Sequence, residues 1–169
     1  MADPLPEVVL VDDEPTAEDL TTVEDLLGRV PRGAFRVVVR HRAGDPVVIR
    51  NHPLLDDGTP MPTRYWLLGE PERTMVSRIE SRGGVDRVED EIGMEVIATA
   101  HDRYAAERDS AVPDGWEGPR PTGGVGGTRR GVKCLHAHYG WWLAGGADPV
   151  GRWVAERLAA GDGDAGPTP

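Results

Sequence analysis

Apolar residues near the N-terminus recur at the spacing of one helix face. The run from Leu20 to Leu27 follows this spacing behind Thr16, whose pairing with Asp19 resembles a capping box. The pattern predicts a helix near 17–29.

The next apolar runs are short and β-branched instead of helical in period. The segments FRVVVR (35–40) and PVVIRN (46–51) are joined by HRAGD, which is typical of a hairpin. RYWLLG (64–69) predicts a third strand, after a turn-rich loop over 52–63 in which Asp56 and Asp57 precede Gly58. The DG pair favours a turn, with a general-base or metal role as the alternative.

Helical periodicity returns in the second half. Helices are predicted from Pro71 to the pair Gly83-Gly84, over about 85–110 with a break near Gly93 as the alternative, over 132–144, and from Pro149 onward. The loop 112–131 between them holds three prolines and seven glycines, which is long for a simple connector. Strands first and helices later predict an α+β fold, with a small antiparallel sheet of about three strands covered by four to five helices.

The net charge of −10 is concentrated at one end. Residues 1–25 carry nine acids and no Lys or Arg, whereas the rest of the chain is nearly neutral. We therefore expect a disordered acidic arm over 1–15, one domain over 16–160, and a disordered tail over 161–169. The arm either aids solubility or docks a partner protein.

Composition also narrows the location and the partners. The sequence has no apolar run long enough for a membrane span, no basic, apolar secretion signal at its start, and one cysteine, so we expect a cytoplasmic protein. An acidic chain opposes attraction to phosphate backbones, which argues against general nucleic-acid binding.

The segment GGVGGTRRGVKCLHAHYGWW (123–142) gathers scarce reactive residues, including the only Cys and the only Lys. Glycines let a backbone turn its N–H groups toward one point, and a helix N-terminus favours an anion. The first hypothesis is a site for a small anion, phosphate or carboxylate, built from Gly124, Gly126, Gly127, Arg129, Arg130 and Lys133. The alternative is a flexible basic loop that pairs with acids of the fold.

The thiol adds possible catalysis. Lys133 and the predicted helix start favour the thiolate of Cys134, and His136, His138 or the distant His101 is a candidate base. The face that carries His101, Tyr104 and Arg108 is otherwise explained by core packing. The chain is thus a possible enzyme, without an assigned reaction.

A metal site is the second hypothesis. Cys134, His136 and His138 offer three ligands within five residues, and His41 or His52 would complete a set of four for zinc or iron. On a helix, Cys134 and His138 would share a face and His136 would not; on an extended segment all three would share one. The alternative is a buried thiol beside packed histidines.

Three segments together resemble a known family: PLLDDGTPMPTRYWL, AHDRYAAERD and GVKCLHAHYGWWLAGGADPVG. The family is an uncharacterised bacterial one, typical of high-GC Gram-positives and known only as a domain of unknown function. The resemblance implies a cytoplasmic protein and no particular activity. Many members resemble this chain but carry extra cysteines, at the position of His41 and near Gly69, which would suit a metal site; here both are absent. A third hypothesis is a non-catalytic adaptor that acts through the acidic arm.

Overall fold

The strands pair in chain order into one antiparallel sheet, β1-β2-β3-β4. The computed structural model describes residues 4–163 and has an α+β fold, as predicted. Its elements are β1 (Val8–Asp13), α1 (Ala17–Leu27), β2 (Phe35–His41), β3 (Pro46–Asn51), β4 (Tyr65–Leu67), α2 (Glu70–Ser81), α3 (Gly84–Ile92), α4 (Met94–Ser110), a 3-10 turn η1 (Val125–Gly127), α5 (Leu135–Leu143) and α6 (Pro149–Ala159).

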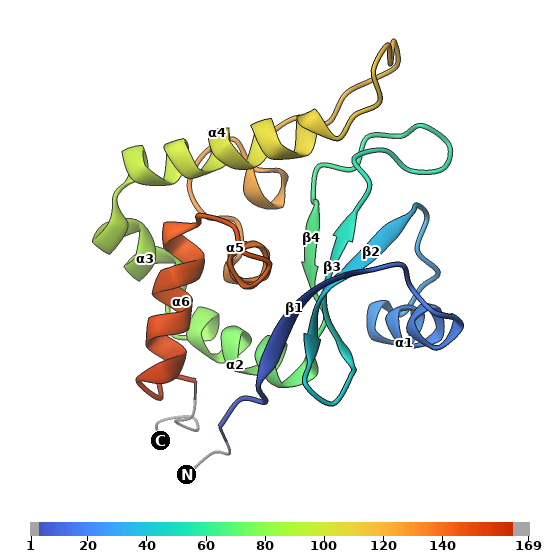
Figure 1. Cartoon of the computed structure of the whole chain (residues 1–169). Helices are drawn as coiled ribbons and strands as arrows, with labels where there is room; N and C mark the ends of the chain where they lie inside the picture. The colour runs from blue at the N-terminus through green and yellow to red at the C-terminus, as the bar shows by residue number, and fades with distance from the viewer. Residues whose placement is uncertain (1–3, 164–169) are drawn as a thin grey trace.

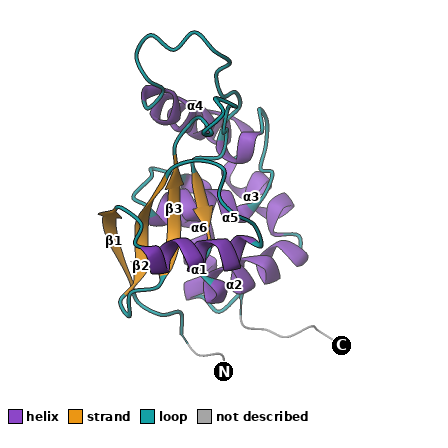
Figure 2. Ribbon diagram, turned by 90° about the vertical axis from the view of Figure 1, so that its right-hand side faces the viewer, coloured by secondary structure: helices purple, strands orange, loops and turns teal. Residues whose placement is uncertain are grey.

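The sheet lies between two unequal layers of helix. Figure 1 shows α1 alone on one side and α2 to α6 on the other, and Figure 2 shows the same layers from the right-hand side. Helix α5 packs most closely on the sheet, against β4, and α6 packs on α5. This arrangement brings the N-terminus of α5 next to α2.

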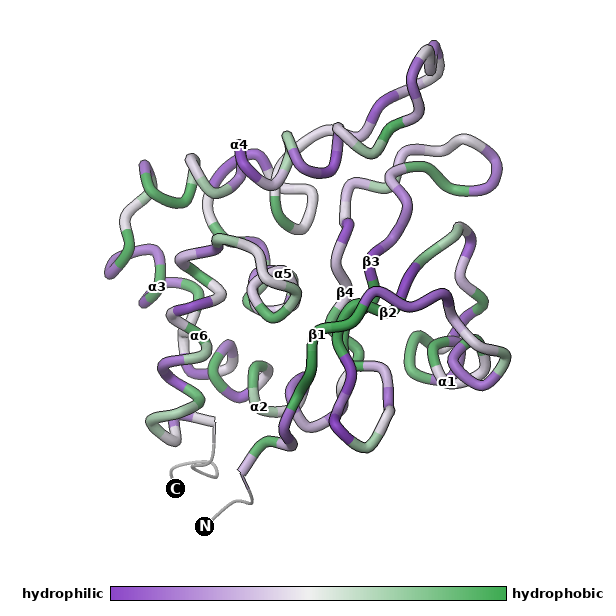
Figure 3. The backbone as a smooth tube through the Cα atoms, viewed as in Figure 1, coloured by the Kyte–Doolittle hydropathy of each residue, from purple (hydrophilic) through white to green (hydrophobic). Residues whose placement is uncertain are grey.

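Alternation along the strands explains why both faces are covered. Val37 and Ile49 are register partners and pack with Val23 of α1, whereas Val48 and Leu67 pair on the opposite face and join the larger core. Because successive strand residues point to opposite faces, an apolar run such as VVV needs a partner on each side. The hydrophobic colouring of the central strands in Figure 3 follows this double burial.

The capping box forms as the sequence predicts. The side chain of Thr16 accepts a hydrogen bond from the N–H of Asp19 (3.1 Å), and the Asp19 carboxylate accepts one from the Thr16 N–H (2.9 Å). The predicted helix over 85–110 is two helices that meet at Gly93, whose φ of 88° favours glycine.

The expectation of a disordered arm over 1–15 is wrong for part of that segment. Residues 8–13 form β1, so the sheet has four strands where about three were predicted. Arginines of β2 and β3 pair with the acids there, which composition near the N-terminus alone does not reveal. Residues 1–3 of the arm lie outside the described residues.

The expectation of a disordered tail over 161–169 is wrong for residues 161–163. The Gly163 carbonyl accepts a hydrogen bond from Arg78 of α2 (3.0 Å), so residues 161–163 are held against the fold, and residues 164–169 lie outside the described part. Among the helices of residues 4–163, none combines the length and apolar character that a membrane crossing requires.

Candidate metal centre

The N-terminus of α5 is held by a side chain from another helix. Cys134 is the N-cap and has an extended backbone (φ −155°, ψ 148°), and its own side chain makes no capping bond. Instead, the Glu80 carboxylate of α2 accepts the N–H of Leu135 at 2.5 Å. An acidic group at this end also interacts favourably with the helix dipole.

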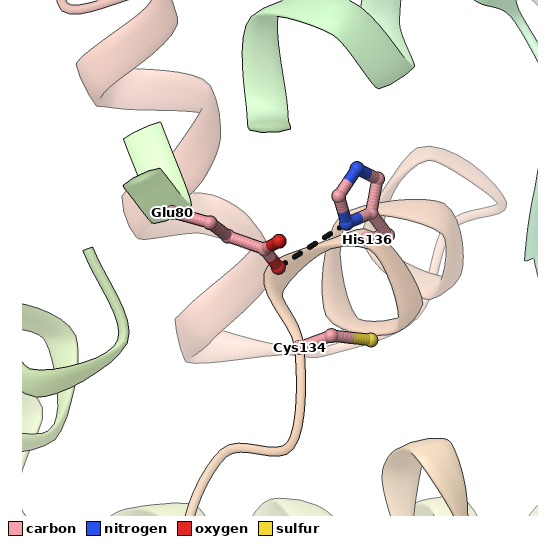
Figure 4. Close-up of side chains that lie close together, drawn as sticks. All are labelled: Glu80, Cys134 and His136. Carbon is pink, nitrogen blue, oxygen red and sulfur yellow. Dashed lines mark hydrogen bonds and ion pairs between the residues drawn. The ribbon is translucent and has the colours of Figure 1, made fainter. Parts of the chain in front are cut away.

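The same carboxylate meets an imidazole. The Nδ1 atom of His136 lies 3.1 Å from Glu80 Oε1, and Figure 4 shows these two side chains turned toward one another beside Cys134. One donor atom from each of Glu80, Cys134 and His136 lies within 4.8 Å of the other two. Carboxylate, thiol and imidazole therefore gather at one point between α2 and α5.

The other ring nitrogen of His136 fixes the tautomer. Nε2 lies 3.2 Å from the Arg73 carbonyl oxygen and 3.1 Å from Ser77 Oγ. A carbonyl only accepts, so the bond to Arg73 places a hydrogen on Nε2. Nδ1 then faces a carboxylate, which requires either a proton or a metal cation on that nitrogen.

Titration follows from these contacts. Burial opposes the positive charge on His136, but the contacts with Cys134 and Glu80 outweigh it and raise the pKa of the ring to about 9. Burial likewise opposes the charge on Glu80, yet its bond to His136 lowers the carboxyl pKa below its usual value. Without metal the pair is an imidazolium and a carboxylate at neutral pH.

A pocket of about 300 Å³ lies next to this cluster. Cys134 and His136 form part of its wall, Arg73 adds a cation, and most of the remaining lining comes from apolar residues of α1 and β4. A small molecule in the pocket would therefore lie beside the thiol and the imidazole.

The four-ligand set that the sequence indicated does not assemble. His41 bonds to the buried Glu72 at 3.0 Å, and His52 bonds to the backbone of Leu54. The helix starts at Leu135 instead of 132, so the extended Cys134 shares a side with His136 and not with His138.

His138 has a structural partner on the opposite side of α5. Its Nδ1 donates to Asp148 Oδ2 at 2.7 Å, and Asp148 Oδ1 caps α6 by accepting the Val150 N–H at 3.0 Å. Both side chains are buried, and Nε2 of His138 has no hydrogen-bond partner among the described residues. This pair ties α5 to α6 and lies away from Cys134.

The glycine loop is packed, and its amides are used internally. The N–H groups of Gly124, Gly127 and Thr128 donate to carbonyls within the loop. His101 joins two parts of the loop: Nδ1 accepts the Val125 N–H at 3.0 Å, and Nε2 donates to the Gly131 carbonyl at 2.7 Å. These amides are therefore not available to the cradle that the sequence predicts for an anion.

The other residues of the predicted anion site are not part of the thiol cluster, although Lys133 directly precedes Cys134. Gly126 is buried and Gly127 exposed, whereas Arg129, Arg130 and Lys133 are exposed. The buried Arg108 donates to the Gly123 carbonyl at 2.8 Å, so the face of α4 that carries His101 and Arg108 positions the loop. His101 and His136 do not meet at one site.

Glu80 is the cluster residue that the sequence did not indicate. It lies 54 positions from Cys134, and the predicted inward face of its helix was the apolar one. A weak signal was present: Arg73, Ser77 and Glu80 recur at i, i+4 and i+7 and form a polar stripe on α2. Asp57 lies outside the cluster and caps its turn, accepting the Thr59 N–H at 3.0 Å.

Comparison with known families places the chain. The model of the family described as Protein of unknown function (DUF501) matches residues 37–156, which is more than half of the chain and confirms the resemblance. No curated protein and no solved structure matches. The chain belongs to the DUF501 family.

Proposed function

We propose that this DUF501 protein binds zinc between α2 and α5, through the Glu80 carboxylate, the Cys134 thiolate and the His136 imidazole. The observation that carries the proposal is the convergence of three different donor types within 4.8 Å. Ligands of one tetrahedral zinc lie roughly 3.5 Å apart, given bonds of about 2.0–2.3 Å. Small side-chain rotations are enough to close the site.

The surroundings of His136 support a metal role. Metal-bound histidines almost always donate their second ring N–H to a carbonyl, a carboxylate or water, which orients the ring. The bond from Nε2 to the Arg73 carbonyl is of this kind, and it leaves Nδ1 to face Glu80. Metal at Nδ1 would replace the proton that the ring carries in the metal-free chain.

The same geometry argues against a protease-type triad in which Cys134 is the nucleophile. In such a triad the carboxylate holds one ring nitrogen and the other takes the proton of the nucleophile. Here Glu80 faces Nδ1, but Nε2 lies against the Arg73 carbonyl and Ser77. The nitrogen that would serve the thiol is already occupied.

The donor set favours zinc over other ions. Calcium and magnesium select oxygen ligands, whereas thiolate with imidazole suits zinc, with ferrous iron as the competitor. Three protein ligands leave a fourth position, which zinc enzymes fill with an activated water. Beside the pocket of about 300 Å³, such a site would support metal-assisted hydrolysis of a small substrate.

The test is a titration of metal-free protein with zinc, followed by calorimetry and elemental analysis. We expect one zinc per chain, and cobalt in its place should show thiolate-to-cobalt charge-transfer absorption. Cys134→Ala and His136→Asn should each lower zinc affinity more than about 100-fold, because the loss of a second-shell partner alone costs 10–100-fold.

The matched control is His52→Asn, which alters a histidine outside the cluster and should bind zinc as wild type does. Substoichiometric zinc in the wild type, or equal affinity in Cys134→Ala, would overturn the proposal. Stoichiometric iron with little zinc would mean that the same site binds iron instead of zinc.

A further inference from the structure

Four arginines on β2, on β3 and in the turn between them form a basic strip: Arg36, Arg40, Arg42 and Arg50. Each pairs with an acid from the N-terminal segment. Arg36 and Arg50 contact Asp12 at 2.6 and 3.0 Å. Arg40 contacts Asp13 at 2.8 Å and also Asp19 of α1 at 2.8 Å, and Arg42 donates to Glu7 at 2.7 Å. The strip is thus covered by carboxylates of the same chain.

Hydrogen bonds and charge hold β1 in place more than burial does. No residue of β1 is fully buried, Leu10 is 64% exposed, and the register with β2 is irregular between Leu10 and Asp13. The strands β2 and β3, by contrast, are mostly buried. If β1 left the sheet, β2 would become an edge strand, and the two cores would lose the contacts of Val8 and Val11 but keep the helices on both faces of the sheet.

The covering N-terminal segment lies outside the region that the family model matches, whereas most of the basic strip lies inside it. The family model begins at residue 37, so β1 and α1 precede it, whereas Arg40, Arg42 and Arg50 lie inside it. A surface within the matched region therefore carries its counter-charges on a segment outside that region.

A pocket continues the strip beyond the end of β1. Its volume is about 280 Å³, and its lining includes Arg36, Arg50 and Arg64, with Glu14 also in the wall. Glu14 pairs with Arg36, and Arg64 lies 3.6 Å from Glu107. Positive groups on this side thus extend past the last residue of β1.

We propose that the basic strip is a docking site for an acidic, extended segment of a partner protein, which adds to β2 in the place that β1 occupies. β1 is the intramolecular occupant: an apolar run followed by three adjacent acids, VVLVDDE. Strand addition supplies backbone hydrogen bonds, and the arginines select acids at the end of the segment.

A peptide fits this surface better than a nucleic acid does. The present occupant is a strand whose Val8 and Val9 pair with His41 and Arg40 of β2, a backbone pattern that a nucleic acid does not offer. The net charge of −10 also opposes a polyanion approaching from solution.

The test weakens the cover in the full chain. The variant Asp12→Asn/Asp13→Asn/Glu14→Gln removes three covering charges, and the matched control Glu18→Gln/Glu24→Gln/Asp25→Asn removes three from α1. The ligand is a fluorescent peptide with the sequence of residues 4–16, measured by anisotropy at low salt. We expect the variant to bind at least about tenfold more tightly than the wild type and the control, and further Arg40→Gln/Arg50→Gln to abolish binding.

A second measurement uses the wild-type chain, without any substitution. In the wild type, saturating peptide should speed hydrogen exchange of β1 amides while β2 amides stay protected, because β1 is displaced. Equal peptide affinity in variant and control, unchanged β1 exchange, or tighter binding of a short DNA duplex than of the peptide would each overturn the proposal.

Discussion

The glycine loop and the α2–α5 junction both involve histidine and charged side chains, but these side chains have different kinds of partner in the two regions. At the loop, the side chains of His101 and Arg108 form hydrogen bonds with backbone groups of the loop itself. At the junction, Glu80, Cys134 and His136 converge from two elements next to a pocket. In this chain the glycine-rich stretch forms a packed turn. The groups that converge at one site, Cys134 and His136, lie a few residues after it.

The difference follows from what each side chain satisfies. Buried backbone groups need partners, and a loop with many turns has many such groups. His101 and Arg108 meet that demand, so they support structure. His136 also contacts a carbonyl, but its other nitrogen faces a carboxylate, and this leaves the group open to a proton or a metal.

The largest effect should come from Arg108→Met. The change removes the donors to the Gly123 carbonyl and its neighbours, so buried acceptors lose their partners. We expect a loss of about 3 kcal/mol in the free energy of unfolding, measured in urea. Zinc stoichiometry should stay unchanged. Arg120→Met, at an exposed position of the same loop, is the control and should cost under about 0.5 kcal/mol.

Gly124→Ala should act next most strongly on the loop. A Cβ there would lie 2.4 Å from Cβ and Nδ1 of His101, although the backbone φ of −101° accepts alanine. Overpacking of this kind costs about 2 kcal/mol, read from the urea midpoint. A neutral result would mean that His101 is not held tightly, which would weaken the structural assignment of the loop.

Zinc affinity should fall as the pH falls, because zinc must displace the proton from His136. The pKa of that ring is about 9, so each unit from pH 8 to 6 should weaken binding at least about tenfold, or 1.4 kcal/mol. Calorimetry in matched buffers measures this slope. A pH-independent affinity would place the metal elsewhere.

The metal-free chain should show the opposite trend. The folded pKa of His136 lies above the value of about 6.5 for a free imidazole, so its contribution to stability is fully present below pH 6.5. It should fade as the pH rises toward 9, which urea unfolding at several pH values would detect. His136→Asn should remove this dependence.

The smallest effect should follow from Arg129→Ala/Arg130→Ala. Both side chains are exposed, so we expect unfolding free energy to change by under about 0.5 kcal/mol and zinc affinity to stay within about twofold. A thermal-shift comparison with phosphate sharpens the contrast with the junction. If phosphate strongly raised the melting temperature of the wild type and this pair of substitutions abolished the increase, the loop would again be a candidate anion site.

Local patterns determined much of the fold. The three predicted strands, the capping box at Thr16 and the α+β class all follow from periodicity and turn residues, and all are confirmed. The N-terminal strand was missed because its acids are paired with arginines 24 to 38 positions away, as Asp12 is with Arg36 and Arg50. The composition of the N-terminal segment shows an excess of acids but does not show their distant arginine partners.

The sequence by itself indicated three of the four described strands, the approximate positions of the helices, the family, and the single cysteine near the start of α5. Only the tertiary structure decided which neighbours that thiol has. The extended backbone at Cys134, where a helix was predicted, selects His136 over His138, and the packing of α2 brings in Glu80. Such choices depend on where whole helices meet, because side-chain contacts across 54 residues leave no local pattern.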